Sequence, residues 1–166
     1  LDGTDAVMLS AETAAGKYPV ETIEQMAAIA LEAERAEFVS LDTDFAGRQF
    51  GRIDQSIAMG ALFTAYHLGC KAILALTESG STALWMSRHR IQVPIYALTT
   101  QPVSQRKMAL YRNVRPLLMP KFDDRDAALA AAEKILVDSG ALMPGDTYAI
   151  TCGEPMGYPG GTNMLK

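Results

Sequence analysis

A hydroxyl and a carboxylate lie two residues apart near the start of the chain, at Ser10 and Glu12. They follow residues 6–9, Ala-Val-Met-Leu, an uninterrupted apolar run that is typical of a strand buried on both faces. Side chains two apart on a strand project to the same side, so the two groups are expected to converge where the strand ends. In barrels of alternating strands and helices, catalytic groups lie at this end of each strand. A purely local interpretation stays open, in which both residues satisfy loop backbone and Glu12 favours the first turn of the following helix.

A second group of polar residues has the spacing of an anion site. Thr77, Ser79, Gly80, Ser81 and Thr82 follow a predicted strand and open directly into a predicted helix. Free backbone N–H groups and the helix dipole favour an anion at such a place. Hydrogen bonds to a charged group contribute about 1.5 to 3 kcal/mol each, so four or five of them can hold a sugar phosphate without a metal. The alternative is an ordinary capped helix, because Ser and Thr are common N-cap residues.

A glycine-rich segment, residues 153–161, joins the last two predicted strands and includes Gly160 and Gly161. We expect it to emerge at the same carboxyl edge of the sheet as the Ser-rich residues. Ligands of open α/β sheets bind at that edge. The two loops together therefore predict one binding site for a small ligand.

The elements that must position these groups alternate along the chain. Strands are predicted at residues 72–77, 94–98, 115–119 and 147–151, and helices at residues 81–90, 103–110 and 124–139. This alternation predicts an α/β fold, a mostly parallel five-stranded sheet with helices on both faces and right-handed crossovers. The last strand, at residues 162–165, follows too closely for a crossover helix, so it should pair antiparallel.

Two further helices precede this sheet. Pro19 suits the first turn of a helix whose apolar residues recur at steps of three and four. Residues 37–53 are polar and irregular and predict a linker. Asp54 is a candidate N-cap for the next helix, which Gly69 ends.

Composition excludes several classes of protein. The chain has 166 residues, a net charge of -4 and a pI near 5.1, which argues against nucleic acid or an anionic membrane as partner. It has no apolar run of about 20 residues and no signal peptide pattern, so we expect a soluble, cytoplasmic protein. Cys70 and Cys152 lack metal-ligand spacing and are expected to be reduced core residues.

The run at residues 2–19 resembles the last barrel strand, loop and helix of the pyruvate kinase family. The family pattern reads Asp-Gly, two spacers, an apolar strand, then Met-Leu-Ser-x-Glu-Thr-Ala-x-Gly-x-Tyr-Pro, and this chain has every fixed position. The resemblance implies that Ser10 and Glu12 line the catalytic pocket and take part in proton delivery to the enolate of pyruvate. A phosphate loop at Gly16 and Lys17 is excluded, because the earlier Gly and the following Ser or Thr of that motif are missing.

The rest of the chain resembles the C-terminal domain of the same family, where these two loops form the allosteric phosphosugar pocket. The effector-binding residues that this implies are Thr77, Ser79, Gly80, Ser81, Thr82, Gly160 and Gly161. Forms activated by fructose 1,6-bisphosphate often carry a basic residue in the Ser-rich loop, where this chain has Glu78. A sugar monophosphate, such as glucose 6-phosphate or ribose 5-phosphate, or AMP is therefore the expected effector.

The resemblance divides the chain into a barrel remnant at residues 1–36, a linker at 37–53 and a regulatory domain at 54–166. The parent enzyme is expected to be a tetramer that converts phosphoenolpyruvate and ADP to pyruvate and ATP with magnesium and potassium. The ligands of those metals belong to earlier barrel strands, so this piece should hold no metal and be inactive alone. The alternatives are a stand-alone module that binds phosphometabolites and a purely structural oligomerisation domain.

Overall fold

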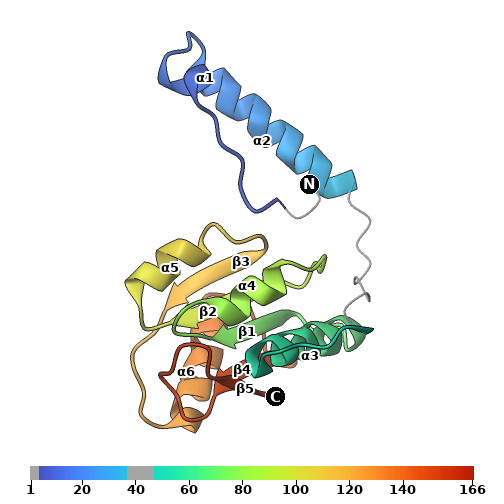
Figure 1. Ribbon diagram of the computed structural model, residues 1–166, viewed down its shortest axis with the longest axis vertical. Helices are drawn as coiled ribbons and strands as arrows, with labels where there is room; N and C mark the ends of the chain where they lie inside the picture. The colour runs from blue at the N-terminus through green and yellow to red at the C-terminus, as the bar shows by residue number, and fades with distance from the viewer. Residues whose placement is uncertain (1–3, 37–46) are drawn as a thin grey trace. The chain divides into compact units, whose positions relative to one another are not determined.

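The structure, a computed structural model, describes residues 4–36 and 47–166 (Figure 1). Its internal contacts divide the chain into two compact units, Leu1–Val39 and Ser40–Lys166. The linker expected at residues 37–53 lies mostly outside the described residues, and its end, residues 47–52, leads directly into the first helix of the second unit.

The first unit contains two helices, α1 (Ala11–Ala14) and α2 (Pro19–Ala36). Proline begins α2, where its fixed φ and its missing N–H cost nothing, because the first N–H groups of a helix have no partner within it. The helix has 18 residues, about five turns, and confirms the helix that the recurrence of its apolar residues predicts. Its apolar residues Ile23, Ile29 and Leu31 are exposed in this unit.

The strand expected at residues 6–9 is wrong for the described chain. Residues 4–10 have no regular secondary structure, and Val7 and Met8 are 59% and 89% exposed. A strand satisfies its backbone N–H and C=O groups on a neighbouring strand, and the described part of this unit has no other strand to supply them. The apolar pattern is therefore present without the partner that would make it a strand.

The second unit is built on one five-stranded sheet in the order β3-β2-β1-β4-β5. Its strands are β1 (Ala72–Leu76), β2 (Ile95–Thr99), β3 (Val114–Leu118), β4 (Tyr148–Gly153) and β5 (Thr162–Leu165). The first four pair in parallel, and β5 pairs antiparallel with β4. This confirms the predicted α/β fold with one antiparallel C-terminal strand. All five residues of β1 are buried, as expected of a central parallel strand covered on both faces.

Helices cover both faces of this sheet (Figure 1). They are α3 (Ile53–His67), α4 (Ser81–Ser87), α5 (Pro102–Met108) and α6 (Arg125–Asp138). Ile73 and Ala75 of β1 share a core cluster with residues of α3, α4 and α5, whereas Leu74 shares a second cluster with residues of α6. Two apolar layers thus enclose the sheet, and its carboxyl edge stays available for polar loops.

Two helix starts show how local chemistry sets the boundaries. Asp124 is the N-cap of α6, and its carboxylate accepts a hydrogen bond from the backbone N–H of Ala127 at 2.7 Å. The prediction that Asp54 caps α3 is wrong, because Arg52 is the N-cap residue and Asp54 lies in the first turn. The carboxylate of Asp54 instead binds other side chains, which are described below. In the described residues no helix is long and apolar enough to cross a bilayer.

Candidate functional site

A cavity of about 620 Å³ opens at the carboxyl ends of the parallel strands. Its walls come from the ends of β1, β2 and β3 and from the loop between β4 and β5. The lining residues are Leu76, Thr77, Glu78, Leu98, Thr100, Gln101, Met119, Pro120, Lys121, Phe122, Asp123, Arg125, Gly153, Glu154, Pro155, Met156, Gly157, Tyr158, Gly160 and Thr162. This volume is in the range of pockets that bind small metabolites and cofactors.

The predicted effector residues fall into two groups around this cavity. Thr77 and Gly160 belong to its wall, which places the Ser-rich loop and the glycine-rich loop at one edge of the sheet. The other five are not among the lining residues; they are Ser79, Gly80, Ser81, Thr82 and Gly161.

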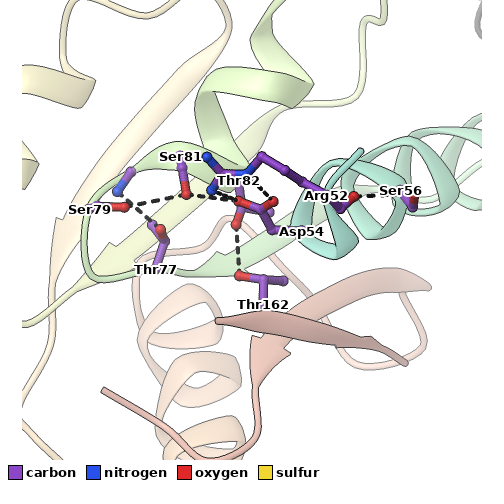
Figure 2. Close-up of polar contacts among 9 residues, drawn as sticks. Arg52, Asp54, Ser56, Thr77, Ser79, Ser81, Thr82 and Thr162 are labelled. Atoms are coloured by element: carbon purple, nitrogen blue, oxygen red, sulfur yellow. Dashed lines mark hydrogen bonds and ion pairs between the residues drawn. The ribbon is translucent and has the colours of Figure 1, made fainter. Parts of the chain in front are cut away.

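The side chains of the Ser-rich loop form hydrogen bonds within the protein (Figure 2). The N–H of Gly80 donates to Thr77 Oγ1 at 3.0 Å, and Gly80 has a φ of +82°, which a residue with a side chain rarely adopts. Ser79 Oγ donates to Ser81 Oγ at 3.3 Å, and Ser81 Oγ donates in turn to Asp54 Oδ2 at 3.3 Å. Both serine protons are thereby directed toward a carboxylate.

Thr82 is fully buried, and its hydroxyl forms a 2.7 Å hydrogen bond with the hydroxyl of Thr162 (Figure 2). This contact joins the first turn of α4 to β5, at the end of the glycine-rich loop. Gly161 donates its N–H to the carbonyl of Tyr158 at 3.0 Å and so closes a turn within that loop.

Sequence reasoning missed the role of Asp54 and Arg52. Asp54 is 1% exposed and forms two hydrogen bonds with the guanidinium of Arg52, from Nε to Oδ1 at 2.9 Å and from Nη2 to Oδ2 at 2.7 Å. The hydrogen bond and charge of Asp54 raise the pKa of Arg52, so Arg52 stays charged. In the sequence, Asp54 is an acidic residue at the start of an apolar helix, and this position also fits an N-cap residue.

Sequence reasoning also missed two cations of the cavity wall, Lys121 and Arg125, which follow β3. Arg125 forms ion pairs with Asp126 at 2.9 Å and with Glu154 at 3.2 Å, and hydrogen bonding to Asp126 is the main cause that raises its pKa. Glu154 belongs to the glycine-rich segment, so this pair bridges the cavity wall. The wall therefore carries both cations and carboxylates.

Glu78 faces its own partners across the end of β2. Its Oε2 accepts hydrogen bonds from Thr100 Oγ1 at 2.9 Å and from Gln101 Nε2 at 3.3 Å. Its backbone carbonyl accepts from Ser104 Oγ at 2.6 Å. Glu78 thus holds the Ser-rich loop to the neighbouring strand end.

In the first unit, Ser10 and Glu12 lie in direct contact. Glu12 Oε2 accepts the backbone N–H of Ser10 at 3.0 Å, and Ser10 is the N-cap residue of α1. Backbone hydrogen bonds from Glu12 itself and from Ser10 lower the pKa of the Glu12 carboxyl. The carboxylate of Glu12 thus binds the backbone of Ser10, a contact that fits the start of a helix.

The described residues contain no group of three or more His, Cys, Asp or Glu side chains able to hold a metal ion. Cys70 and Cys152 are free and buried, as their sequence context predicts, and burial raises the pKa of both thiols. The wall of the cavity offers hydroxyls, backbone N–H groups, cations and carboxylates to a ligand.

Comparison with known proteins gives a consistent result. The family described as "Pyruvate kinase, alpha/beta domain" matches residues 55–166. "Pyruvate kinase II" of Salmonella typhimurium is 43% identical over 167 residues, which cover 100% of this chain and 35% of that protein. "Pyruvate kinase" of Buchnera aphidicola subsp. Baizongia pistaciae is 42% identical over 100% of this chain and 35% of its own length. "Pyruvate kinase" of Haemophilus influenzae is 41% identical over 154 residues, which cover 92% of this chain and 32% of that protein.

Proposed function

Because the chain belongs to the pyruvate kinase family, we propose that it is the C-terminal part of a cytoplasmic enzyme that transfers a phosphoryl group from phosphoenolpyruvate to ADP. The match of residues 55–166 to the alpha/beta domain and the names of the relatives support this proposal. In the same proposal, residues 1–36 are the last strand, loop and helix of the barrel of that enzyme.

The magnesium and potassium ions of such an enzyme find no fit among the described residues. These residues offer no group of three or more His, Cys, Asp or Glu side chains that could hold a metal ion. Phosphoryl transfer depends on metals and positioned cations to stabilise charge. The 166-residue chain alone should therefore form no pyruvate from phosphoenolpyruvate and ADP, which an assay coupled to lactate dehydrogenase measures directly.

Ser10 and Glu12 are proposed to act in the whole enzyme, where Ser10 takes part in proton delivery to the enolate of pyruvate. The hydrogen bond between Glu12 Oε2 and the N–H of Ser10 supports this, because it fixes the backbone that carries the hydroxyl. The hydrogen bonds to this carboxylate also lower the pKa of Glu12, so the contact belongs to its ionised form. General acid catalysis typically contributes about 10²- to 10⁴-fold, so Ser10→Ala should lower kcat of the whole enzyme within that range.

The function proposed for the second unit is binding of a phosphorylated effector, a sugar monophosphate or AMP. The observation that carries this is the cavity of about 620 Å³ at the carboxyl edge of the sheet, with Lys121 and Arg125 in its wall. Cations attract the phosphate, and the glycine-rich loop brings backbone close to the ligand. In this proposal Thr77 and Gly160, which line the cavity, contact the ligand, and the other expected effector residues, which do not line it, hold the two loops in place; they are Ser79, Gly80, Ser81, Thr82 and Gly161.

The carboxylates of the wall favour one phosphate over two. Glu78, Asp123 and Glu154 line the same cavity as the two cations. A second phosphate would meet these carboxylates, and like charges at short range repel. A monophosphate therefore fits this wall better than fructose 1,6-bisphosphate does.

Effector binding would act on the whole enzyme by a shift of population. An effector biases the arrangement of an oligomer by no more than its difference in affinity for the two states, typically about 1 to 3 kcal/mol. The expected oligomer is a tetramer.

A structural oligomerisation domain is the second candidate, and the outer surface of α3 favours it. Phe63, Tyr66 and Leu68 are exposed on or just after this helix. Burial of such residues between subunits is a common source of stability in oligomers. This candidate predicts self-association without effector binding.

Calorimetric titration of the 166-residue chain with glucose 6-phosphate, ribose 5-phosphate and AMP separates the two candidates. Effector binding predicts a saturable heat signal with at least one of these phosphates and no signal with glucose. A ligand that binds should also raise the free energy of unfolding, by about 2.7 kcal/mol at 100 times its Kd. Arg125→Met and Lys121→Met should weaken binding. Lys71→Met is the matched control, because Lys71 precedes β1 at the opposite edge of the sheet. Absence of any signal, with self-association in sedimentation, would favour the second candidate.

A further inference from the structure

The ion pair of Arg52 and Asp54 contacts both loops of the proposed effector site. One side of Asp54 binds the guanidinium of Arg52 through both carboxylate oxygens, at 2.9 and 2.7 Å. The same carboxylate accepts the proton of Ser81 Oγ at 3.3 Å, across a separation of 27 residues (Figure 2). The pair therefore reaches the Ser-rich loop, residues 77–82.

The pair also lies against the glycine-rich loop, residues 153–161. A Cβ atom added to Gly160 would lie 2.9 Å from Arg52 Nη2 and 3.9 Å from Asp54 Oδ2. A side chain at this place would displace the guanidinium, and the φ of +72° at Gly160 also favours glycine. One wall residue of the cavity thus packs directly on the ion pair.

The hydrogen bonds orient the hydroxyls of Ser79 and Ser81 toward the carboxylate of Asp54. Ser79 Oγ donates to Ser81 Oγ, and Ser81 Oγ donates to Asp54, so the carboxylate sets the orientation of both. The Arg52 side chain is 55% exposed, but it pairs with a carboxylate that is 1% exposed, and a buried charge that loses its partner is costly. Loss of Arg52 should therefore rearrange Asp54 and both serines.

We propose that Arg52 and Asp54 are positioning residues that hold the Ser-rich and glycine-rich loops in the arrangement that binds a phosphorylated ligand. Neither residue belongs to the cavity wall, so each acts through Ser81 and Gly160 rather than on the ligand. The identity of the ligand rests on the function proposed above. The positioning itself concerns the free protein and can be measured without a ligand.

Hydrogen exchange of the free 166-residue chain tests the positioning. Arg52→Met removes the charge and both hydrogen bonds but keeps a long side chain. The reporters are the amides of Gly80 and Gly161, which donate to Thr77 Oγ1 and to the carbonyl of Tyr158. Both should exchange at least ten-fold faster in the variant, while the amides within β2 exchange as before. Unchanged exchange at both glycines would overturn the proposal.

Arg48→Met is the matched control. Arg48 is exposed four residues earlier in the same segment, so its loss removes the same charge without touching either loop. Exchange at Gly80 and Gly161 should stay at the wild-type rate in this variant. Equal acceleration in both variants would mean that net charge controls the loops, and it would overturn the proposal.

Titration with glucose 6-phosphate adds a measurement that a merely stabilising ion pair would not change. The Kd should rise at least ten-fold in Arg52→Met and stay unchanged in Arg48→Met. It should rise less in Arg52→Lys, because lysine keeps the charge but cannot form the two paired hydrogen bonds. A lower unfolding midpoint with an unchanged Kd would overturn the proposal. If the wild-type chain binds none of the three phosphorylated probes, the proposed function fails, and the exchange rates alone decide the positioning.

A double-mutant cycle isolates the contact between Arg52 and Gly160. Gly160→Ala carries the cost of its backbone conformation in every background, so this cost cancels in the cycle. In the wild-type background the new Cβ also displaces the guanidinium. Gly160→Ala should therefore accelerate exchange at Gly80 in both backgrounds. The acceleration factor should be at least three-fold smaller in the Arg52→Ala background than in the wild-type background. Equal acceleration in the two backgrounds would contradict a contact between these residues.

Discussion

Replacement of Thr82 by Val should destabilise the second unit through a single hydrogen bond. The hydroxyl of Thr82 is fully buried and lies 2.7 Å from the hydroxyl of Thr162, which is 5% exposed. Valine has nearly the shape of threonine, so it leaves no cavity. The substitution removes the hydrogen bond and leaves the hydroxyl of Thr162 without this partner.

The magnitude follows from that geometry. Removal of one member of a buried pair costs the desolvation of the other, about 1 to 3 kcal/mol. Replacement of both hydroxyls by methyl groups leaves no orphan and can be nearly neutral. Each single variant should therefore lose about 2 kcal/mol, and Thr82→Val with Thr162→Val should lose less than either single variant alone, well short of the summed loss of about 4 kcal/mol.

Urea denaturation followed by circular dichroism measures these differences. With an m-value of about 1 to 3 kcal/mol per M, a loss of 2 kcal/mol shifts the midpoint by roughly 1 M. The m-values of the four proteins should agree, since the surface exposed on unfolding is the same. Losses of the two single variants that add within about 0.3 kcal/mol would refute the buried pair, because additivity is the behaviour of independent sites.

Three further predictions use backbone geometry and ionisation. Gly80→Ala should cost about 1 to 2 kcal/mol for its positive φ. It should cost a further 1 to 3 kcal/mol or so because the new Cβ would lie 2.8 Å from Cγ of the buried Met108. Gly140→Ala, with φ +73° and open space, should show only the first cost in the same urea assay; equal costs would contradict the packing. Asp124→Ala should lose the N-cap of α6 and about 1 kcal/mol, and a loss below about 0.3 kcal/mol would contradict the cap. The pKa of the Glu12 carboxyl, measured by ¹³C NMR, should lie below its ordinary 4.5, because hydrogen bonds stabilise its ionised form. The stability that these bonds contribute is present above pH 4.5 and is lost as the pH falls through the folded pKa. A midpoint at or above 4.5 would contradict this.

The sheet was accessible from the sequence because its signals are local. β1 is apolar throughout, and the segment between β4 and β5 is too short for a crossover helix. The helix expected at residues 124–139 also corresponds to α6, whose start depends on residues within one turn. Such features require no knowledge of the tertiary structure.

What the sequence did not predict depends on distant partners. Asp54 has the same local context as an N-cap, and only Ser81, 27 residues away, shows its use. Lys121 and Arg125 follow β3 as an ordinary polar loop, and only the strand order places them at the edge that carries the glycine-rich loop. The strand at residues 6–9 failed for the same reason, since a strand is defined by its neighbour.

The central claim, that a phosphorylated metabolite binds at the carboxyl edge of the sheet, is tested most directly by an NMR titration of the ¹⁵N-labelled 166-residue chain with glucose 6-phosphate. The account predicts saturable shifts of the amide signals of residues 77–82 and 157–162, with the signals of residues 71–73 at the opposite edge unchanged. Saturable shifts confined to other parts of the chain, or no shifts with glucose 6-phosphate, ribose 5-phosphate or AMP, would contradict it.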